Sequence, residues 1–565
     1  MTADLERLAD EFWDATLAAD PAQGTAIGEH RYGDRLSDIT LAGRAALSRR
    51  FEEIRAAVAG LPPQADPEAA LTQAALAQAV GDRLAILAAD ARSFTVDAMS
   101  GPQTAFLDIP SFQPLRDVAD GESMLARWWA MGPWVDQQIE QLRRGSADGK
   151  LPVAGSVRRV IAQLDELLAR PLEEWPLLAP LRAEHAGWSD GAWRAFEVGL
   201  AGAVRDGLRP AFLRYRAYLA DEVVDGARDE AHVGISNLPG GAETYASLAR
   251  AHTTTDRTPQ EIHAIGLAEI ARIDAEITEL GGRVLGTADL AATLAALRGD
   301  PSVHFTSPEE IVAVAEASLA RAVAAIPQWF GRLPRAACEV VRMQAHEEQH
   351  STIAYYREPP EDGSRPGRYY VNTYAPETRP RYEAEALAFH EAVPGHHLQV
   401  AIGQELEQLP AFRRHAETTA FVEGWGLYAE RLSDEMGLYS GDLDRIGMLS
   451  YDAWRASRLV VDTGMHALGW SRGQAIEFMT AHTALGLNNI ANEVDRYIGW
   501  PGQALAYKIG QLEIRRLRSE AEAALGAAFD IRRFHDAVLG HGALPLSVLR
   551  ESVRRDLGLP PGSAA

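Results

Sequence analysis

One short segment combines the residue types with which zinc hydrolases hold a metal ion. It reads His390-Glu391-Ala392-Val393-Pro394-Gly395-His396. In the HExxH helix motif, two histidines four positions apart reach one zinc ion from a single helical face, and the glutamate between them lies beside the attacking water. The segment therefore predicts one bound Zn²⁺ ion, with His390 and His396 as ligands and Glu391 as the general base.

The spacing of these two histidines departs from the regular motif, because six positions separate them instead of four. In a continuous helix this would place the second imidazole off the face of the first and about 9 Å further along the axis. Proline cannot donate a backbone hydrogen bond and glycine tolerates unusual dihedrals, so Pro394-Gly395 predicts a bulge that restores the common face. His397 is the competing second ligand, but it would lie about 10 Å along the axis from His390. We therefore prefer His396 and expect His397 to face the substrate or to support a ligand.

The third protein ligand must come from elsewhere, and Glu423 is the best candidate. It lies in an otherwise apolar stretch of sequence. Burying a carboxylate is costly unless it is paired or binds a metal, which favours this residue over three nearby alternatives, Glu417, Glu430 and His415. Three protein ligands leave one coordination position open for water, as catalytic zinc requires. Glu391 would accept the proton of that water as it attacks a carbonyl carbon.

A second segment, His346-Glu347-Glu348-Gln349-His350, matches HExxH letter for letter. It lies among β-branched and aromatic residues that are typical of strands. On a strand, residues four positions apart stand about 13 Å from each other, which is too far for both to bind one ion. We therefore expect this match to be accidental.

The elements around these residues are predicted to be mainly α-helical, with an internal cleft. Apolar residues recur mostly at three- and four-residue spacing. Between about residues 340 and 374, β-branched and aromatic runs separated by proline- and glycine-containing turns predict a small sheet beside the metal helix. The segment 233–241 is the expected linker between an N-terminal helical half, 1–235, and a catalytic half, 236–565, unless both halves share one core.

Composition excludes several classes of function. The formal net charge of -24 repels polyanions, so we expect no nucleic-acid partner. The single cysteine, Cys338, excludes an internal disulfide and a thiolate zinc cluster. The N-terminus shows no basic segment followed by an apolar run, and no stretch approaches the roughly 20 apolar residues of a membrane span. A cytoplasmic protein without a membrane partner is therefore expected, and the sequence gives no oligomeric state.

Several segments resemble a bacterial family known as domain of unknown function 885. The hallmarks of that family are a DGSRPG turn, a HEAVPGHHLQ helix and an EGW-LYAE helix, found here at Asp362 to Gly367, His390 to Gln399 and Glu423 to Glu430, with further likeness at 461–466 and 496–504. The family is similar to helical metallopeptidases of the thimet oligopeptidase and thermostable carboxypeptidase kind. Those peptidases carry HExGHAL on the metal helix, and its Gly-His-Ala-Leu part, laid on Gly395-His396-His397-Leu398, points to His396 as the second ligand.

The resemblance also implies roles for residues outside the metal site. The related peptidases align an extended substrate on a strand beside the metal helix, and they stabilise the oxyanion with a tyrosine. The segment 369–373, with Tyr370 and Asn372, would be that strand. Tyr507, or else Tyr497, would be that tyrosine.

Three further side chains share one helical face, because Arg458, Asp462 and His466 follow each other at four-residue spacing. If that face points into the cleft, His466 would assist the oxyanion or the substrate; an ordinary salt-bridge stripe is the alternative. Arg365 and Arg496 would bind a substrate carboxylate, unless they form structural ion pairs.

The predicted function is zinc-dependent hydrolysis of amide bonds in short or unstructured peptides. The alternatives are a metal-dependent hydrolase of a non-peptide amide or ester, and a non-catalytic binding protein that retains the fold.

Overall fold

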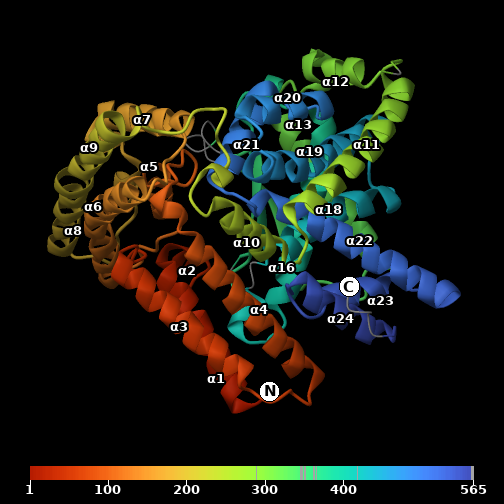
Figure 1. The fold of residues 1–565 in the computed structure, drawn as a ribbon, viewed down its shortest axis with the longest axis horizontal. Coiled ribbons are helices and arrows are strands. Elements are labelled where there is room, and N and C mark those ends of the chain that lie inside the picture. Colours follow the sequence, from red (N-terminus) through yellow and green to blue (C-terminus); the bar gives the residue numbers. More distant parts are fainter. Residues whose placement is uncertain are drawn as a thin grey trace.

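The protein is mainly α-helical with one small β-sheet, which confirms the fold class expected from the apolar spacing (Figure 1). The computed structural model describes residues 1–287, 289–343, 348, 352–360, 363, 365–415 and 418–560.

The N-terminal helices form two groups that differ in the core they enter. The helices are α1 (Ala3–Ala19), α2 (Pro21–Ala26), α3 (Leu41–Ala59), α4 (Pro67–Ala89), α5 (Pro102–Asp108), α6 (Val118–Ala147), α7 (Ala154–Ala169), α8 (Asp190–Gly202) and α9 (Arg209–Tyr218). Helices α5 to α9 enclose a hydrophobic core of their own and stand together at one side of the molecule (Figure 1). Helices α1, α3 and α4 instead contribute to a core that also contains residues 235–557. One core therefore spans the expected boundary at residue 235, and the two-domain division stays a prediction.

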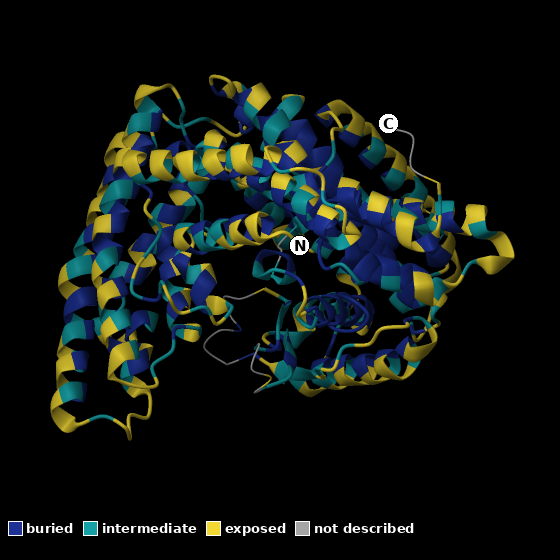
Figure 2. Ribbon diagram, turned by 90° about the horizontal axis from the view of Figure 1, so that it is seen from below, coloured by how far each residue is buried: buried dark blue, intermediate teal, exposed yellow. Residues whose placement is uncertain are grey.

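The remaining helices surround a buried centre. They are α10 (Gly241–Thr253), α11 (Pro259–Val284), α12 (Leu290–Gly299), α13 (Pro308–Ala325), α15 (Ala384–Glu391), α16 (His396–Gln404), α17 (Ala411–Arg414), α18 (Thr419–Glu435), α19 (Asp442–Ala467), α20 (Arg472–His482), α21 (Leu487–Gly499), α22 (Ala506–Leu525), α23 (Ile531–Leu539) and α24 (Leu546–Leu557). Helix α19 is buried on all sides from Ile446 to His466, as expected for a helix with neighbours all around it. Figure 2 shows the buried residues gathered in the interior, while the outer helices expose one face. No helix in the described ranges has the length and apolarity that a membrane crossing needs.

The sheet lies where the aromatic and β-branched residues predict it, and it precedes helix α15 in the sequence. Its strands are β1 (Cys338–Arg342), β2 (Ala354–Arg357) and β3 (Gly367–Val371), in the order β1-β3-β2. β3 pairs in parallel with β1 and antiparallel with β2. Helix α13 packs against β1 and β3, and α15 packs against β2. The sheet thus holds one flank of the candidate metal site.

Candidate metal site

The two histidines of the metal segment lie on two separate helices. The chain leaves α15 after Glu391 and starts α16 at His396. Pro394 cannot continue the hydrogen-bond ladder of a helix, and a Cβ on Gly395 would lie 1.9 Å from the carbonyl oxygen of His390. Glycine is therefore needed where the chain passes the end of α15. The predicted bulge inside one continuous helix is wrong, because the helix ends and a second one begins.

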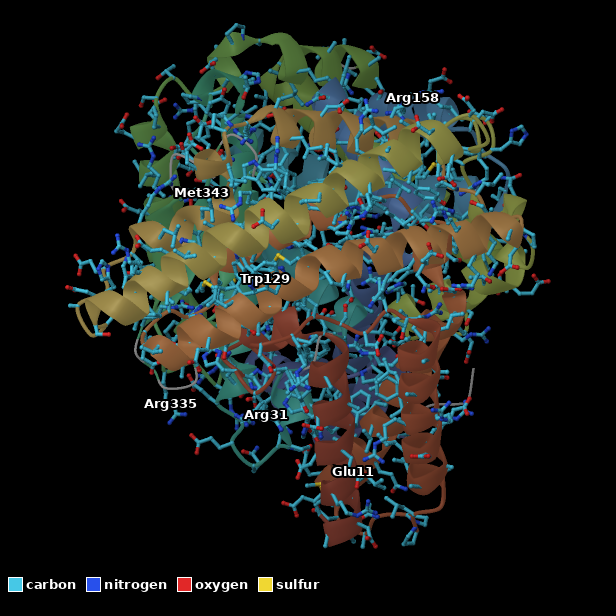
Figure 3. The ribbon with its side chains drawn as sticks, turned by 90° about the vertical axis from the view of Figure 1, so that its left-hand side faces the viewer. Glu11, Arg31, Trp129, Arg158, Arg335 and Met343 are labelled. Atoms are coloured by element: carbon cyan, nitrogen blue, oxygen red, sulfur yellow. The ribbon has the colours of Figure 1, made fainter. Side chains whose placement is uncertain are left out.

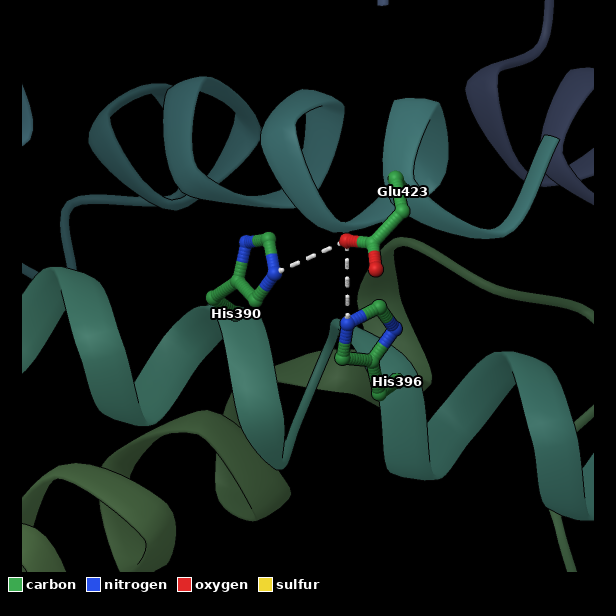
Figure 4. Close-up of side chains that lie close together, drawn as sticks. All are labelled: His390, His396 and Glu423. Atoms are coloured by element: carbon green, nitrogen blue, oxygen red, sulfur yellow. Dashed lines mark ion pairs between the residues drawn. The ribbon is translucent and has the colours of Figure 1, made fainter. Parts of the chain in front are cut away.

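This break brings three side chains together. The Nε2 atoms of His390 and His396 each lie 3.5 Å from one carboxylate oxygen, Oε2, of Glu423 (Figure 4). Within the described ranges, these residues form the one group of three or more His, Cys, Asp or Glu whose ligand atoms all lie within 4.8 Å of one another. The side chains of His390, His396 and Glu423 keep 4%, 12% and 21% of their surface exposed, so the group is accessible mainly from the side of Glu423.

The donor set fits a zinc ion. Nitrogen and oxygen ligands at about 2.1 Å from a tetrahedral zinc ion lie roughly 3.4 Å from each other. The two imidazole-to-carboxylate distances of 3.5 Å are close to that value. Two imidazoles and one carboxylate are also a donor set that leaves a fourth position open.

Helix α18 supplies both the carboxylate and the support of His390. Glu430 lies two turns after Glu423, and its Oε1 atom is 2.8 Å from Nδ1 of His390. Gly426 lies between them, and a Cβ there would come within 2.6 Å of Cε1 of His390. The ring of His390 therefore packs directly on the backbone of α18, with one nitrogen turned to Glu430 and the other to Glu423. A carboxylate on the second ring nitrogen fixes the tautomer of a metal-binding histidine and makes it a stronger ligand.

Burial and two carboxylates, Glu423 and Glu430, set the electrostatics of the group. Burial opposes a charge on His390, but Glu423 and Glu430 raise its pKa to about 9. Burial alone would raise the pKa of the Glu423 carboxyl, but His390 and His396 hold this pKa well below its usual range. Without a metal ion the chain thus retains a proton among these groups. A bound cation would take the place of that proton.

Glu391 and Tyr507 lie beside the group. Burial, with the charge of Glu391, raises the pKa of Tyr369 on β3, and Glu391 also helps to raise the pKa of His390, so this carboxylate acts on both the sheet and the candidate ligands. Burial and the nearby charge of Glu423 raise the pKa of Tyr507 at the start of α22. Its ring lies 4.3 Å from the guanidinium carbon of Arg458. Tyr507 is therefore a neutral hydrogen-bond donor close to the predicted ligands.

Two other predicted residues are engaged elsewhere. The hydroxyl of Tyr497 accepts hydrogen bonds from Trp454 and Arg458 and donates one to Glu493. The ring of His466 lies between the backbone N–H of Ile235, at 3.2 Å from Nδ1, and the carbonyl oxygen of Tyr497, at 2.9 Å from Nε2. Both nitrogens of His466 are thus occupied by backbone groups, which leaves none for an oxyanion.

His397 is likewise no ligand of the group. Its Nδ1 lies 3.0 Å from the hydroxyl of Tyr356 on β2, and its Nε2 lies 3.0 Å from the carbonyl oxygen of Ala336. Burial lowers the pKa of His397 to about 4. This neutral imidazole therefore connects α16 to the sheet.

The strand predicted to align a substrate cannot pair with one. β3 is the central strand, and both of its edges are taken by β1 and β2. Asn372 is buried and donates to the carbonyl oxygens of Glu348 and Thr352. Backbone pairing of a substrate with 369–373 is therefore excluded. The prediction failed because the sequence shows where strands lie but not their order in the sheet.

The predicted arginines have different surroundings. Arg496 contacts Glu493 and Gln503, which is the structural ion pair considered as the alternative. Arg365 lies close enough to Tyr370 for the two to interact electrostatically. Several residues singled out from the sequence lie outside the described residues: His346, Glu347, Gln349 and His350 of the second HExxH match, Asp362 and Ser364 of the DGSRPG turn, and Glu417.

Comparisons with known proteins identify relatives over nearly the whole chain. A family described as "Bacterial protein of unknown function (DUF885)" matches residues 21–553. A crystal structure of a "putative lipoprotein" from Colwellia psychrerythraea is 26% identical, with a TM-score of 0.90 over 99% of this chain and 100% of that one. A second structure, described as "a putative lipoprotein of unknown function" from Shewanella oneidensis, is 18% identical and shares the fold. Its TM-score is 0.72 over 97% of this chain and 99% of that one. No curated protein matches the chain.

Proposed function

Because the chain belongs to the DUF885 family, whose description states no activity, we propose a function from the site itself: zinc-dependent hydrolysis of amide bonds in short or unstructured peptides. The observation that carries this proposal is the convergence of His390, His396 and Glu423, with Glu391 next to His390 at the end of α15. The hydrogen bond from His390 to Glu430 supports it, because a second carboxylate behind a histidine is typical of metal ligands.

The residues around the group divide the chemical work. Zinc, when bound by His390, His396 and Glu423, would act as a Lewis acid toward a substrate carbonyl and toward water. Glu391 follows a ligand in sequence and ends α15, so its carboxylate can accept a proton from the attacking water and pass it to the leaving amine.

Tyr507 suits the stabilisation of the oxyanion. It lies near Glu423, it is partly exposed, and burial keeps its hydroxyl protonated, so it can donate a hydrogen bond to the developing negative oxygen. Arg458 stacks on its ring and restricts the positions that the hydroxyl can take. Tyr497 and His466, whose polar atoms are already bonded, have no part in this step.

The test is Glu391→Gln, with Glu377→Gln as a matched control on the surface. Each protein is loaded with zinc, its metal content is measured by mass spectrometry, and cleavage of a mixed peptide library is followed. We expect Glu391→Gln to keep one zinc ion and to lose at least roughly a hundredfold in turnover, while the control keeps both. A wild-type protein that binds no zinc would refute the proposal. Zinc binding with hydrolysis of small esters or amides, but of no peptide, would favour the non-peptide alternative.

A further inference from the structure

The face of the sheet opposite the candidate metal site carries a group of arginines and tyrosines that are half-buried. Tyr355 on β2 and Tyr370 on β3 are direct cross-strand neighbours, and their rings stack at 4.7 Å. The guanidinium of Arg357 lies 5.9 Å from the first ring and 5.6 Å from the second. Arg368 stands directly across from Arg357 in the register, and Arg365 lies nearby. We call this set, Tyr355, Tyr370, Arg357, Arg365 and Arg368, the arginine–tyrosine patch.

Among the described residues, the cations of this patch outnumber the carboxylates that pair with them. Arg368 is paired with Glu339 on β1, at 2.7 Å. The hydrogen bond that holds Arg365 goes to the backbone carbonyl of Pro366, which carries no charge. Arg357 has its ring contacts and faces Arg368, a like charge across the strands, which is an unfavourable pair. Among the described residues of the patch and its neighbours on β1, three cations thus face one carboxylate.

The three arginines lie close enough to influence one another. Burial, Arg357 and Arg368 together lower the pKa of Arg365, as expected for a cation beside like charges. Glu358 follows Arg357, has contacts of its own, and acts with its charge on Tyr356. Counted with the patch, it would still leave three cations against two carboxylates. The protein has a net charge of -24, yet this patch places three arginines close together. Such a group of cations can bind an anion.

Strand β2 connects the patch with the candidate metal site. It packs against α15, and Tyr356 contacts His397, the neighbour of His396. Successive side chains of a strand point to opposite faces, so Tyr356 faces the metal helices while Tyr355 and Arg357 face the patch. In the part of the chain that the structure describes, β3 is the strand partner of β2, and the other edge of β2 pairs with no strand.

We propose that the arginine–tyrosine patch binds the acidic side chains of a peptide that extends along the outer edge of β2, and that it gives the enzyme a preference for acidic substrates. A strand added to that edge presents every second side chain on the patch face, directly across from Tyr355 or Arg357. Guanidinium groups bind carboxylates through two parallel hydrogen bonds. The preference in cleavage rests on the proposed function, whereas the binding does not.

The observations favour a short acidic peptide over a nucleic acid. A nucleic acid carries a charge on every nucleotide and would be repelled by the large negative charge of the protein. A peptide with a few carboxylates at alternate positions is repelled less, and its backbone can pair with β2. The two tyrosine rings lie beside that position and can pack on the stems of glutamate side chains.

The binding test uses full-length protein with Glu391→Gln, so that the probe is not consumed. Two fluorescein-labelled octapeptides serve as probes, one alternating alanine with glutamate and one alternating alanine with glutamine, and binding is followed by anisotropy at low and at high salt. Arg357→Gln is the test variant. Arg158→Gln removes one exposed arginine from α7, on another part of the surface (Figure 3), and is the control.

We expect the glutamate peptide to bind more tightly than the glutamine peptide, and salt to reduce the difference. An exposed ion pair contributes up to about fivefold in affinity, so Arg357→Gln should weaken the glutamate peptide by up to about fivefold and leave the glutamine peptide unchanged. Arg357→Glu should abolish the preference for the glutamate peptide, because two carboxylates would then balance the two remaining cations, Arg365 and Arg368. The melting temperature should not fall, because the substitution removes a like-charge pair.

Equal binding of the two peptides by the Arg158→Gln control, or equal effects of Arg357→Gln on both, would overturn the proposal. Tighter binding of a single-stranded oligonucleotide, if it depends on Arg357, would also overturn it. If the glutamate peptide binds through Arg357 but the active protein cleaves no peptide, the proposed function fails and the binding site stands. If the active protein cleaves both peptides equally and binds them equally, the peptidase function stands and this inference fails.

Discussion

Glu430 offers the sharpest test of the candidate metal site, because it contacts a predicted ligand without being one. Its carboxylate lies 2.8 Å from Nδ1 of His390. Glu430→Gln keeps the size of the side chain and an oxygen that can accept this hydrogen bond, but it removes the charge. Loss of such an outer carboxylate typically weakens metal binding by about 10- to 100-fold, or about 1.4 to 2.7 kcal/mol.

The size of this effect should depend on pH, and the sign follows from the pKa of His390. Burial lowers this pKa, but Glu423 and Glu430 raise it to about 9 in the metal-free protein. A histidine must be neutral to bind zinc, so below pH 9 the metal has to displace a proton. The apparent zinc affinity of the wild type should therefore fall about tenfold for each pH unit below 9. In Glu430→Gln the pKa of His390 is lower, so the variant loses less affinity as the pH falls.

The expected result is a deficit of Glu430→Gln that is largest near pH 9 and small at pH 7. Zinc dissociation constants are measured by competition with a fluorescent chelator from pH 7 to 9, on protein stripped of metal, with the chelator calibrated at each pH. Glu435→Gln, on the same helix but paired with Arg518 at the surface, is the control and should follow the wild type. Parallel pH profiles for the wild type and Glu430→Gln would refute this account of His390.

Two further predictions address the geometry around the ligands. In Gly426→Ala the new Cβ would lie 2.6 Å from Cε1 of His390, so the ring must move away from Glu423. Because one of the three ligands is displaced, we expect the zinc content after dialysis to fall below roughly half of the wild-type value. A full complement of zinc would show that α18 does not set the position of the ring. In Tyr507→Phe the zinc content should stay unchanged while turnover falls about 100-fold, as for the loss of an oxyanion donor; unchanged turnover would remove Tyr507 from the mechanism.

The sequence singled out the three residues that the fold brings together, His390, His396 and Glu423, but it did not show the path of the chain between them. Residue type, spacing and the apolar surroundings of Glu423 were enough to select these three as a candidate metal-binding group. A Pro-Gly pair is compatible with either a bulge or a helix end. What decides between them is the close approach of Gly395 to the carbonyl oxygen of His390, a contact that exists only in the folded chain.

Helical spacing was similarly sufficient for one conclusion and insufficient for another. It shows that Arg458 and His466 share a face of one helix, but α19 is buried on all sides, so a shared face does not mean a shared cleft. Arg458 contacts Tyr507 beside the site, whereas His466, two turns further on, contacts Ile235 and Tyr497. Neighbours on a buried helix are set by the packing of distant segments, which no local pattern reveals. The support that Glu430 gives to His390 was missed for the same reason.

The sheet connects the two proposals through the alternation of its side chains. On β2, Tyr356 points toward His397 on α16, and Arg357 points to the opposite face, where it forms part of the arginine–tyrosine patch. A peptide paired with β2 would have its own side chains divided in the same way, every second one on each face. A shift by one residue exchanges the two sets, so acidic residues would leave the patch and lose its guanidinium partners. The charges of the patch would therefore select one register of an acidic peptide, and with it the bond that is presented to the metal site.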